Sequence, residues 1–258
     1  MLGSTGERVN LDEREYLRVI ETARNATPDS ITFIVGAGQQ STCTTIEEIA
    51  RAANAGAQAA LVITPNYYRS AITQEALVRH YTSVADASTI PIILYSMPDL
   101  TGIKIEPQTA AHLSEHQNII GMKDSSNDTQ NFKRSADMVG EDFAMMIGNG
   151  TVFAQNLQAG GRGGILAVGC CAPQACLDIY RAVHAGESDR AAALQEKLTP
   201  LARAVTKTYG IGGLKAAMEI GGYVGGEVRA PLQRPSADAV LEIESLLRDC
   251  MHVSEARA

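Results

Sequence analysis

Residues 118–126 read Asn-Ile-Ile-Gly-Met-Lys-Asp-Ser-Ser, a mostly apolar run that ends in a lysine and continues into small and polar residues. This pattern predicts a short buried strand that stops at Lys123. Burial disfavours the charged ammonium and frees the neutral amine, which attacks carbonyl carbons to form a Schiff base. Taken alone, the position favours a structural lysine whose side chain extends to the edge of the sheet, where water solvates its ammonium group. The other motifs in the chain favour the interpretation of Lys123 as a nucleophile.

The composition excludes several classes of protein. The chain has 258 residues, of which 45% are hydrophobic, so it can form one large domain or two small ones. The net charge is −7 and the basic residues are scattered, which argues against a nucleic-acid or membrane surface. No apolar run approaches the ~18 residues of a membrane span.

Cysteines and histidines predict no metal site. The five cysteines show no Cys-x-x-Cys pair, and their odd number without a framework indicates reduced thiols in an intracellular compartment. The histidines fall in helical or terminal segments and are interpreted as surface residues: His80, His112, His116, His184 and His252.

Six apolar runs along the chain predict strands, and helical patterns separate them. The predicted strands are residues 31–38, 59–64, 91–96, 118–123, 143–150 and 164–168. The predicted helices are residues 11–24, a segment capped by Thr44 or Thr45 that ends near Gly56, and residues 74–87, 107–115, 128–139 and 152–158. From Pro173 onward the chain reads as mostly helical, with breaks near Gly186, residues 210–213 and residues 221–226.

Strands that are apolar throughout are buried on both faces, as in a parallel sheet covered by helices. Neither a Gly-x-Gly-x-x-Gly motif after the first strand nor a P-loop is present, so a nucleotide-binding open sheet lacks its signature. The better fit is an α/β fold of the (β/α)8 TIM-barrel class with a C-terminal helical extension. In such barrels the chemistry lies at the carboxyl ends of the strands, where the informative residues fall: Ser4, Thr5, Tyr67, Tyr95, Lys123, Gly148 and Ile165.

Five motifs occur in a fixed order along the chain. They are Gly-Ser-Thr-Gly-Glu (3–7), Thr-Pro-Asn-Tyr-Tyr (64–68), Tyr-Ser-Met-Pro-Asp-Leu-Thr-Gly (95–102), Gly-Met-Lys-Asp (121–124) and Gly-Gly-Arg-Gly-Gly-Ile (160–165). Together they resemble the dihydrodipicolinate synthase/N-acetylneuraminate lyase family of class I aldolases, over essentially the whole chain. Within that family they look most like the mitochondrial 4-hydroxy-2-oxoglutarate aldolases.

The resemblance implies a role for each motif. Lys123 would form the Schiff base with the keto carbon of pyruvate or of a 2-oxo acid, and the protonated imine would draw electrons during carbon–carbon cleavage. Tyr95 would relay the proton to and from the aldol hydroxyl, for which a phenol needs a charged or hydrogen-bonding neighbour. Ser4 and Thr5 would hold the pyruvyl carboxylate.

The remaining residues carried over shape the pocket and the assembly. Ser125, Gly148 and Ile165 would line the pocket, and Tyr67 would cross a dimer interface into the neighbour's site. The resemblance thus implies a homo-oligomer, a dimer of dimers, that needs no cofactor. Each motif also has a plainer interpretation: Tyr95 as a core tyrosine, Tyr67 and Tyr68 as an ordinary loop pair, and residues 3–6 as a turn with a helix cap.

Two departures from the family pattern stand out. Dihydrodipicolinate synthases carry an arginine two residues after the proline of the third motif, and here that position is Leu100. A distal substrate carboxylate would then need another partner, with Arg69 and Arg162 as candidates. The chain also starts at the loop that follows the family's second strand, which predicts a barrel lacking its first two strands.

These interpretations predict an incomplete barrel domain over residues 1–172 and C-terminal helices packed on it over residues 173–258. The expected function is that of a carbon–carbon lyase that cleaves 4-hydroxy-2-oxoglutarate, or a close 2-oxo acid, to pyruvate and glyoxylate or another aldehyde. Two alternatives stay open. One is another activity of the family: a 2-keto-3-deoxy sugar-acid aldolase or dehydratase, or an N-acetylneuraminate lyase. The other is a truncated non-catalytic chain that pairs with full-length subunits. The expected location is mitochondrial or cytoplasmic, and a targeting segment would be lost with the missing strands.

Overall fold

The computed structural model describes residues 1–255, and their side chains as far as residue 250. The chain forms two compact units, Met1–Met146 (unit 1) and Ile147–Ala258 (unit 2). The division predicted between residues 172 and 173 concerns domains and stays a prediction.

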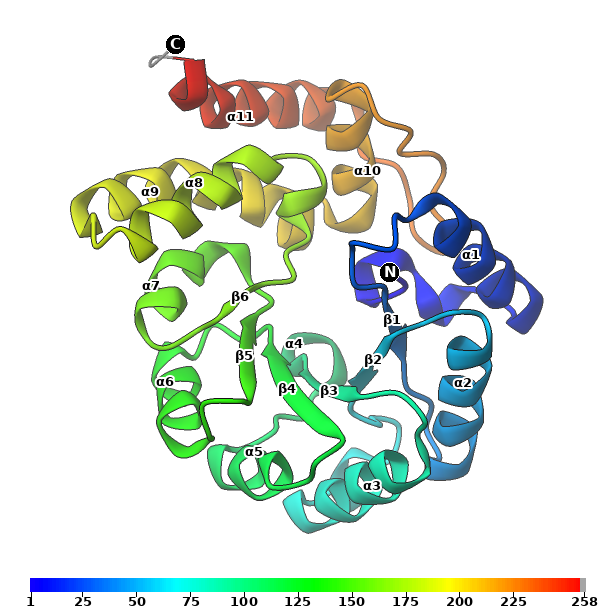
Figure 1. Ribbon diagram of the computed structural model, residues 1–258. Coiled ribbons are helices and arrows are strands. Elements are labelled where there is room, and N and C mark those ends of the chain that lie inside the picture. The colour runs from blue at the N-terminus through cyan, green and yellow to red at the C-terminus, as the bar shows by residue number, and fades with distance from the viewer. Residues whose placement is uncertain (256–258) are drawn as a thin grey trace. The chain divides into compact units, whose positions relative to one another are not determined.

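Unit 1 alternates strands and helices along the chain (Figure 1). Its strands are β1 (Ile34–Ala37), β2 (Ala59–Ile63), β3 (Ile92–Ser96) and β4 (Ile119–Asp124), and β5 (Ala144–Ile147) ends at the unit boundary. Its helices are α1 (Glu13–Ala26), α2 (Thr42–Asn54), α3 (Gln74–Ala87), α4 (Pro98–Thr101), α5 (Pro107–Ser114) and α6 (Thr129–Met138), with short 3-10 turns η1 (Ser4–Gly6), η2 (Arg8–Asn10) and η3 (Arg69–Ala71).

The strands pair in the order of the sequence. β1, β2, β3 and β4 are parallel neighbours, and β5 follows β4 in the strand order. Helices α1, α2, α3 and α5 lie on the outer side of β1–β4 (Figure 1). The predicted α/β fold with a parallel sheet is therefore confirmed, and the carboxyl ends of β1–β4 meet at one edge.

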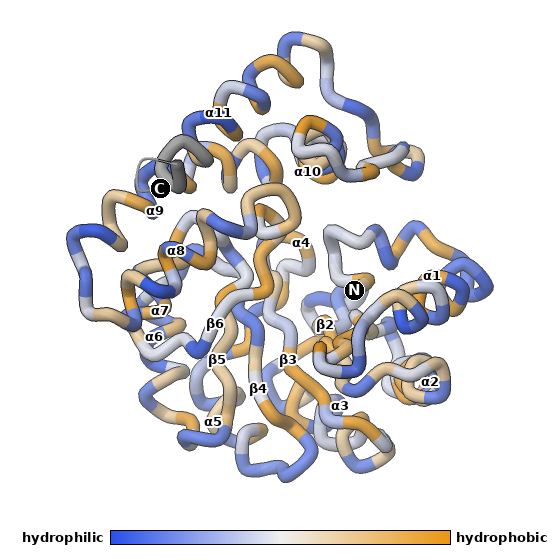
Figure 2. Tube along the Cα trace, turned by 45° about the horizontal axis from the view of Figure 1, so that its top comes forward, coloured by the Kyte–Doolittle hydropathy of each residue, from blue (hydrophilic) through white to orange (hydrophobic). Residues whose placement is uncertain are grey.

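Apolar strand residues build the interior of unit 1. All five residues of β3 are buried, and Figure 2 shows hydrophobic residues concentrated along β2 and β3. Leu61, Ile93 and Tyr95 form one cluster, with Ile34, Ile63 and Met97 packed against it. Tyr95 therefore belongs to the packed interior and also ends near the sheet's carboxyl edge.

Polar residues fix where the first helices begin. Asp12 and Glu15 form a reciprocal capping box at the start of α1. The side chain of Ser41, rather than the predicted Thr44 or Thr45, caps α2 by accepting from the Thr44 N–H at 3.1 Å. Residues 41–45 contain four hydroxyl residues, each of which can serve as an N-cap, so the sequence alone did not separate them.

The first residues run beside β1 as the end of a neighbouring strand would. The Met1 nitrogen donates to the Ile34 carbonyl at 2.6 Å, and the Gly36 N–H donates to the Met1 carbonyl at 2.7 Å. Leu2 is buried in the cluster that contains Tyr16 and Ile20. These contacts hold the start of the Gly-Ser-Thr-Gly-Glu segment against the sheet.

Replacing Gly36 with alanine is expected to push this segment away from β1. A Cβ on Gly36 would collide with the Leu2 carbonyl group and lie 2.7 Å from the Gly3 nitrogen. We expect the free energy of unfolding to fall by about 1–3 kcal/mol, as in other overpacked sites, measured by denaturant titration. The control is Gly140→Ala, whose Cβ meets no atom within 4 Å. Equal stability of both variants would contradict the close approach.

Unit 2 is mainly helical. It contains η4 (Gly150–Val152), α7 (Phe153–Gln158), β6 (Gly163–Gly164), η5 (Val168–Cys170), α8 (Pro173–His184), α9 (Ser188–Arg203), a π-helical turn η6 (Ala204–Thr208), α10 (Gly210–Ile220) and α11 (Ala237–Glu255). The strand predicted over residues 164–168 is shorter than expected: β6 covers only Gly163 and Gly164, and η5 begins at Val168. The break predicted near residues 210–213 lies one residue earlier, at Tyr209, between η6 and α10. These glycines open α10, where a Cβ on Gly212 would collide with the Gln233 carbonyl.

None of the helices within residues 1–255 is both long enough and apolar enough to cross a bilayer.

The prediction that the histidines are surface residues is wrong for His80. His112 and His184 are exposed, and His252 lies outside the residues whose side chains are described. His80 lies on α3 with 7% of its surface exposed. Its Nδ1 is 2.9 Å from Thr42 Oγ1, and its Nε2 has no hydrogen-bond partner. Burial lowers the pKa of the His80 imidazole to about 4.

His80 is expected to make the fold sensitive to acid. Below pH 6.5 the unfolded chain protonates this imidazole, whereas the folded chain does so only near pH 4. The free energy of unfolding should therefore fall between these two pH values, by at most about 3 kcal/mol from this residue. Denaturant titrations at several pH values should show a shallower slope for His80→Gln and an unchanged slope for the exposed His112→Gln. Parallel slopes for His80→Gln and the unmodified chain would contradict the assignment.

Candidate active site

The structure places Lys123 beside Tyr95. The two residues are register partners on the parallel neighbours β3 and β4, and β4 ends at Asp124, one residue later than predicted. Lys123 is 6% exposed and Tyr95 is 3% exposed. The Lys123 Nζ lies 4.3 Å from the centroid of the Tyr95 ring, within the range of a cation–π contact. A primary amine and a phenol thus share one buried site at the carboxyl edge of the sheet.

Ser4 joins this pair from the first segment of the chain. Its Oγ lies 3.3 Å from the Tyr95 hydroxyl, and either oxygen can be the donor. Ser4 begins the η1 turn, which is closed by bonds from Gly6 N–H to the Gly3 carbonyl and from Glu7 N–H to the Ser4 carbonyl. The family resemblance implied that Ser4 holds the substrate carboxylate and did not indicate its contact with Tyr95. The contact supplies the hydrogen-bonding neighbour that a phenol needs for proton transfer.

Thr5 lies in the same η1 turn and is partly buried. Its predicted part in holding a carboxylate stays a prediction.

Ser125 follows β4 and points a buried hydroxyl into the protein. Its N–H donates to the Ser96 carbonyl at 3.0 Å, whereas its Oγ has no hydrogen-bond partner. The Oγ of Thr64, after the end of β2, is also buried without a partner. Buried hydroxyls without partners are unfavourable, so both can accept or donate to a bound molecule.

Asp124 is the buried carboxylate nearest in sequence to Lys123. Desolvation raises its pKa, whereas the Ser126 N–H, which donates to Oδ1 at 2.7 Å, opposes the shift. This contact closes the turn after β4.

The structure does not bring Tyr67 into the buried site. Its side chain is 76% exposed, and its ring lies 5.0 Å from that of Tyr68 in an edge-on arrangement. The loop itself is held, because Gln40 Oε1 accepts the N–H groups of Asn66 at 2.9 Å and Tyr67 at 2.8 Å. The side chain of Tyr67 is therefore exposed to solvent, while hydrogen bonds hold the backbone of its loop in place.

Gly148 and Ile165 belong to unit 2. Gly148 directly follows β5, and the Ile165 N–H donates to the Ile147 carbonyl at 2.8 Å. Arg162 also lies in this unit. The predicted roles of these three residues at the pocket stay predictions.

Arg69 packs against the turn that contains Leu100. A Cβ on Gly102 would lie 3.0 Å from Arg69 Cδ and 3.2 Å from its Nε. Gly102 ends the short helix α4 in the left-handed conformation, and Leu100 is an exposed residue of that helix. A guanidinium thus lies beside the turn in which the resemblance implies a carboxylate-binding arginine in the synthases.

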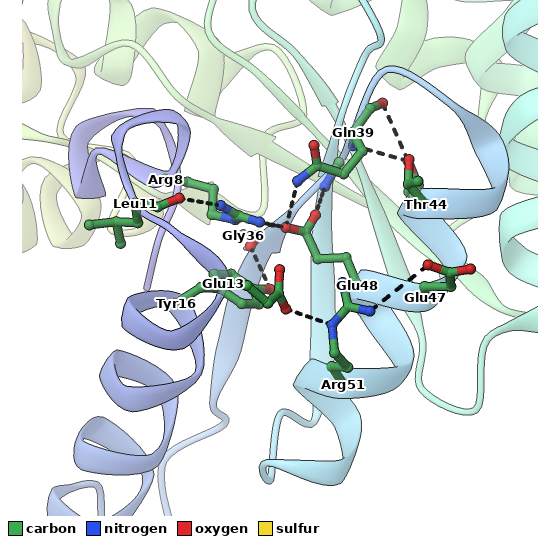
Figure 3. Close-up of polar contacts among 12 residues, drawn as sticks. Arg8, Leu11, Glu13, Tyr16, Gly36, Gln39, Thr44, Glu47, Glu48 and Arg51 are labelled. Carbon is green, nitrogen blue, oxygen red and sulfur yellow. Dashed lines mark hydrogen bonds and ion pairs between the residues drawn. The ribbon is translucent and has the colours of Figure 1, made fainter.

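Sequence reasoning missed one buried ion pair, between Arg8 and Glu48 (Figure 3). A signal existed: Glu48 shares the buried face of α2 with Thr45, Ile49 and Ala52, at helical spacing. A carboxylate in such a stripe needs a buried partner. Nothing in the sequence indicated that the partner was Arg8, 40 residues earlier.

Among the described residues, no group of three or more histidine, cysteine, aspartate or glutamate side chains could hold a metal ion. The expected independence from metals and cofactors stays a prediction.

Comparison with known sequences gives one consistent result. The profile of the dihydrodipicolinate synthetase family matches residues 1–250. A 4-hydroxy-tetrahydrodipicolinate synthase from Rhodopseudomonas palustris is 35% identical over 246 residues, which cover 95% of this chain and 82% of the relative. A second enzyme of that name, from Haloarcula marismortui, is 35% identical and covers 95% of this chain and 80% of its own length.

Solved structures show the same relationship. A monomeric dihydrodipicolinate synthase variant superposes with a TM-score of 0.91 at 30% identity, covering 97% of this chain and 84% of the other. The chloride-inhibited dihydrodipicolinate synthase from Acinetobacter baumannii, solved in complex with pyruvate, gives a TM-score of 0.87 at 29% identity, with coverage of 96% and 84%.

Proposed function

This chain belongs to the dihydrodipicolinate synthetase family, a family of class I aldolases and lyases, and from that premise we propose that Lys123 is its Schiff-base nucleophile. The observation that carries the proposal is the buried contact between the Lys123 amine and the Tyr95 ring, with the Tyr95 hydroxyl beside Ser4. A solved relative in complex with pyruvate supports pyruvate as the common ligand.

The proposed reaction begins at the keto carbon of a 4-hydroxy-2-oxo acid. The neutral Lys123 amine adds to that carbon, and loss of water gives the protonated imine. Tyr95 accepts the proton of the C4 hydroxyl, the C3–C4 bond breaks, and its electron pair moves toward the imine nitrogen to form an enamine. An aldehyde leaves. A proton returns to C3, and water releases pyruvate and the free amine.

Tyr95 requires a path for that proton. Its hydroxyl is 3.3 Å from Ser4 Oγ, which can pass a proton toward or away from the phenol. The unpartnered Ser125 hydroxyl offers a further hydrogen bond to the bound substrate. We propose that Ser4, Thr5, Ser125, Gly148 and Ile165 form the substrate-binding set.

The substrate we propose is 4-hydroxy-2-oxoglutarate, which would yield pyruvate and glyoxylate. Leu100 stands where the resemblance implies the carboxylate-binding arginine of the synthases, and Arg69 packs against Gly102 at the end of the same helix. An arginine fork binds carboxylates through paired, charge-assisted hydrogen bonds. Arg69 would therefore bind the distal carboxylate, which distinguishes this substrate from 2-oxo acids that have only the C1 carboxylate.

Replacing Arg69 with glutamine is expected to raise KM for 4-hydroxy-2-oxoglutarate by about 10- to 100-fold, as loss of one charged hydrogen-bonding partner typically does. KM for a 4-hydroxy-2-oxo acid without a distal carboxylate should stay the same. Arg79, exposed and ion-paired with Glu75 at 2.6 Å on α3, supplies the matched control Arg79→Gln. Steady-state kinetics on both substrates test whether Arg69 contacts the distal carboxylate. Equal changes in KM for the two substrates would exclude that contact.

A second candidate is 4-hydroxy-tetrahydrodipicolinate synthesis, which the names of the 35%-identical relatives favour. A panel separates the candidates: cleavage of 4-hydroxy-2-oxoglutarate, of 2-keto-3-deoxy sugar acids and of N-acetylneuraminate, and formation of 4-hydroxy-tetrahydrodipicolinate. A folded chain that turns over none of them and co-purifies with longer subunits would support the non-catalytic alternative.

The direct test of the proposed nucleophile is intact mass after incubation with pyruvate and sodium borohydride. We expect a gain of one reduced pyruvyl group, which peptide mapping assigns to Lys123. An unmodified mass from a folded sample would refute the Schiff-base proposal.

We also propose a homo-oligomer, a dimer of dimers, in which the exposed Tyr67 ring reaches the site of a neighbouring subunit. One solved relative is a monomeric variant, so assembly varies among the relatives. Light scattering on the chain and on Tyr67→Ser would test the assembly. A mitochondrial or cytoplasmic location stays a prediction.

A further inference from the structure

Arg8 and Glu48 form a buried ion pair next to the segment that carries Ser4 (Figure 3). Arg8 Nε donates to Glu48 Oε1 at 2.7 Å, and its Nη2 donates to the same oxygen. The Arg8 side chain is 13% exposed and that of Glu48 is fully buried. The pair joins η2 to α2.

The Glu48 carboxylate also fixes the loop after β1. Its Oε2 accepts the Gly38 N–H at 2.7 Å, and its Oε1 accepts the Gln39 side-chain amide at 2.9 Å. Two donors from this loop and two from Arg8 therefore converge on one carboxylate. Such a buried pair adds little to stability compared with apolar residues of the same size, but its hydrogen bonds define one geometry. The pair is therefore better suited to orienting two segments than to holding the fold together.

The other face of Arg8 is held by α1. Its guanidinium carbon lies 4.1 Å from the centroid of the Tyr16 ring. The Tyr16 hydroxyl donates to the Gly36 carbonyl of β1 at 3.2 Å. Arg8 is thus enclosed by side chains that are themselves anchored to β1 and α2.

The segment between Arg8 and the sheet is conformationally strained. Leu2 has φ 54° and Glu7 has φ 55°, and both are non-glycine residues in the left-handed region. The η1 turn with Ser4 lies between them. Strained residues persist only where the surroundings hold them. The backbone contacts of Met1 hold one end of the segment, and Arg8 holds the other.

We propose that the Arg8–Glu48 pair positions Ser4 against the Tyr95 hydroxyl. Neither residue touches a reacting atom, so both are positioning residues that act through Ser4. This inference rests on the proposed function, because the rate it affects is that of proton transfer through Tyr95. Without the pair, the η1 turn is free to relax, and the 3.3 Å contact between Ser4 Oγ and Tyr95 is no longer maintained.

The test is a double-mutant cycle with the full chain, using kcat for 4-hydroxy-2-oxoglutarate. We expect Ser4→Ala and Arg8→Met each to lower kcat by about tenfold or more. If Arg8 acts through Ser4, Arg8→Met should lower kcat by less than about twofold once Ser4 is alanine, since coupled residues are not additive. Both variants should still form the borohydride-trapped pyruvate adduct.

Arg8→Met leaves the buried Glu48 carboxylate without its ion-pair partner and can therefore fail to fold. A second variant keeps the test decisive in that case. Arg8→Met/Glu48→Gln removes both charges and keeps an amide oxygen that can accept the Gly38 N–H. This variant is expected to fold and to show the same loss of kcat. The matched control is Arg51→Met, which breaks the more exposed Arg51–Glu13 pair between α2 and α1 and should keep kcat within twofold.

The outcomes separate the two proposals. Independent, multiplicative losses in the cycle would overturn the positioning role, and so would full kcat in a folded Arg8→Met/Glu48→Gln chain. In either case the pyruvate adduct of the unmodified chain would still support the proposed function. Absence of that adduct in the unmodified chain would refute the proposed function and the positioning role together.

Discussion

Replacing Lys123 with alanine is expected to abolish the borohydride-trapped pyruvate adduct and to lower kcat by about 10⁴-fold or more. Covalent catalysis depends on the attacking amine, and loss of a nucleophile typically leaves only the residual rate that binding provides. The rest of the site is expected to keep its structure, because the Lys123 side chain packs on the Tyr95 ring.

The matched control for this variant is another lysine. Lys133 lies on α6, is 60% exposed and pairs with Asp137 at 2.7 Å. Lys133→Ala should keep both the adduct and kcat, since surface ion pairs contribute little even to stability. Turnover of Lys123→Ala within tenfold of the unmodified chain, from a folded sample, would show that the buried amine is a structural residue only.

The parts of the fold that the sequence predicted well are those with strong patterns. The helix over residues 74–87 has the predicted bounds, and β2 and β3 lie within one residue of their predicted ranges. Apolar runs bounded by polar or glycine residues leave few alternatives for a buried parallel strand. The family identified by resemblance is the family that the comparisons show. Its finer assignment to 4-hydroxy-2-oxoglutarate cleavage stays a proposal.

The pairing of Lys123 with Tyr95 could also be predicted from strong local patterns. Both residues were predicted at the ends of buried strands, and neighbouring parallel strands bring their carboxyl ends to one edge. The third member was harder to place. Ser4 was recognised as a site residue, but its bond to the Tyr95 hydroxyl joins positions 91 residues apart. A bond of that kind depends on the path of the first segment beside β1, which no local pattern encodes.

The error at His80 and the omission of the Glu48 ion pair both concern residues on the buried face of a helix. Histidine is a polar residue type that is often exposed, yet His80 lies on the buried face of α3, where its ring contacts that of Tyr81. Glu48 lies on the inner face of α2 because Arg8, Gly38 and Gln39 supply its donors. At both positions, tertiary contacts bury a residue of a type that is usually exposed. The TIM barrel lacking its first two strands and the roles of Gly148 and Ile165 stay predictions.

Replacing Tyr95 with phenylalanine is expected to separate imine formation from bond cleavage. The ring would keep its contact with the Lys123 Nζ and its place in the cluster with Leu61 and Ile93, so the fold and the pyruvate adduct should be retained. The hydroxyl beside Ser4 would be lost, and kcat should fall by about 10²- to 10⁴-fold, the usual contribution of a positioned proton-transfer group. Steady-state cleavage of 4-hydroxy-2-oxoglutarate and intact mass after borohydride treatment measure the two effects.

Tyr81 provides the matched control, because it is also a buried tyrosine whose hydroxyl is hydrogen-bonded. Its hydroxyl donates to the Val62 carbonyl at 3.1 Å, so Tyr81→Phe should cost about 1 kcal/mol of unfolding free energy and leave kcat unchanged. A Tyr95→Phe chain with the same pattern, less stable but fully active, would make Tyr95 a core tyrosine. Loss of the adduct together with kcat would instead place Tyr95 in imine formation. Retention of the adduct with loss of kcat is the result that assigns its hydroxyl to the proton transfer of carbon–carbon cleavage.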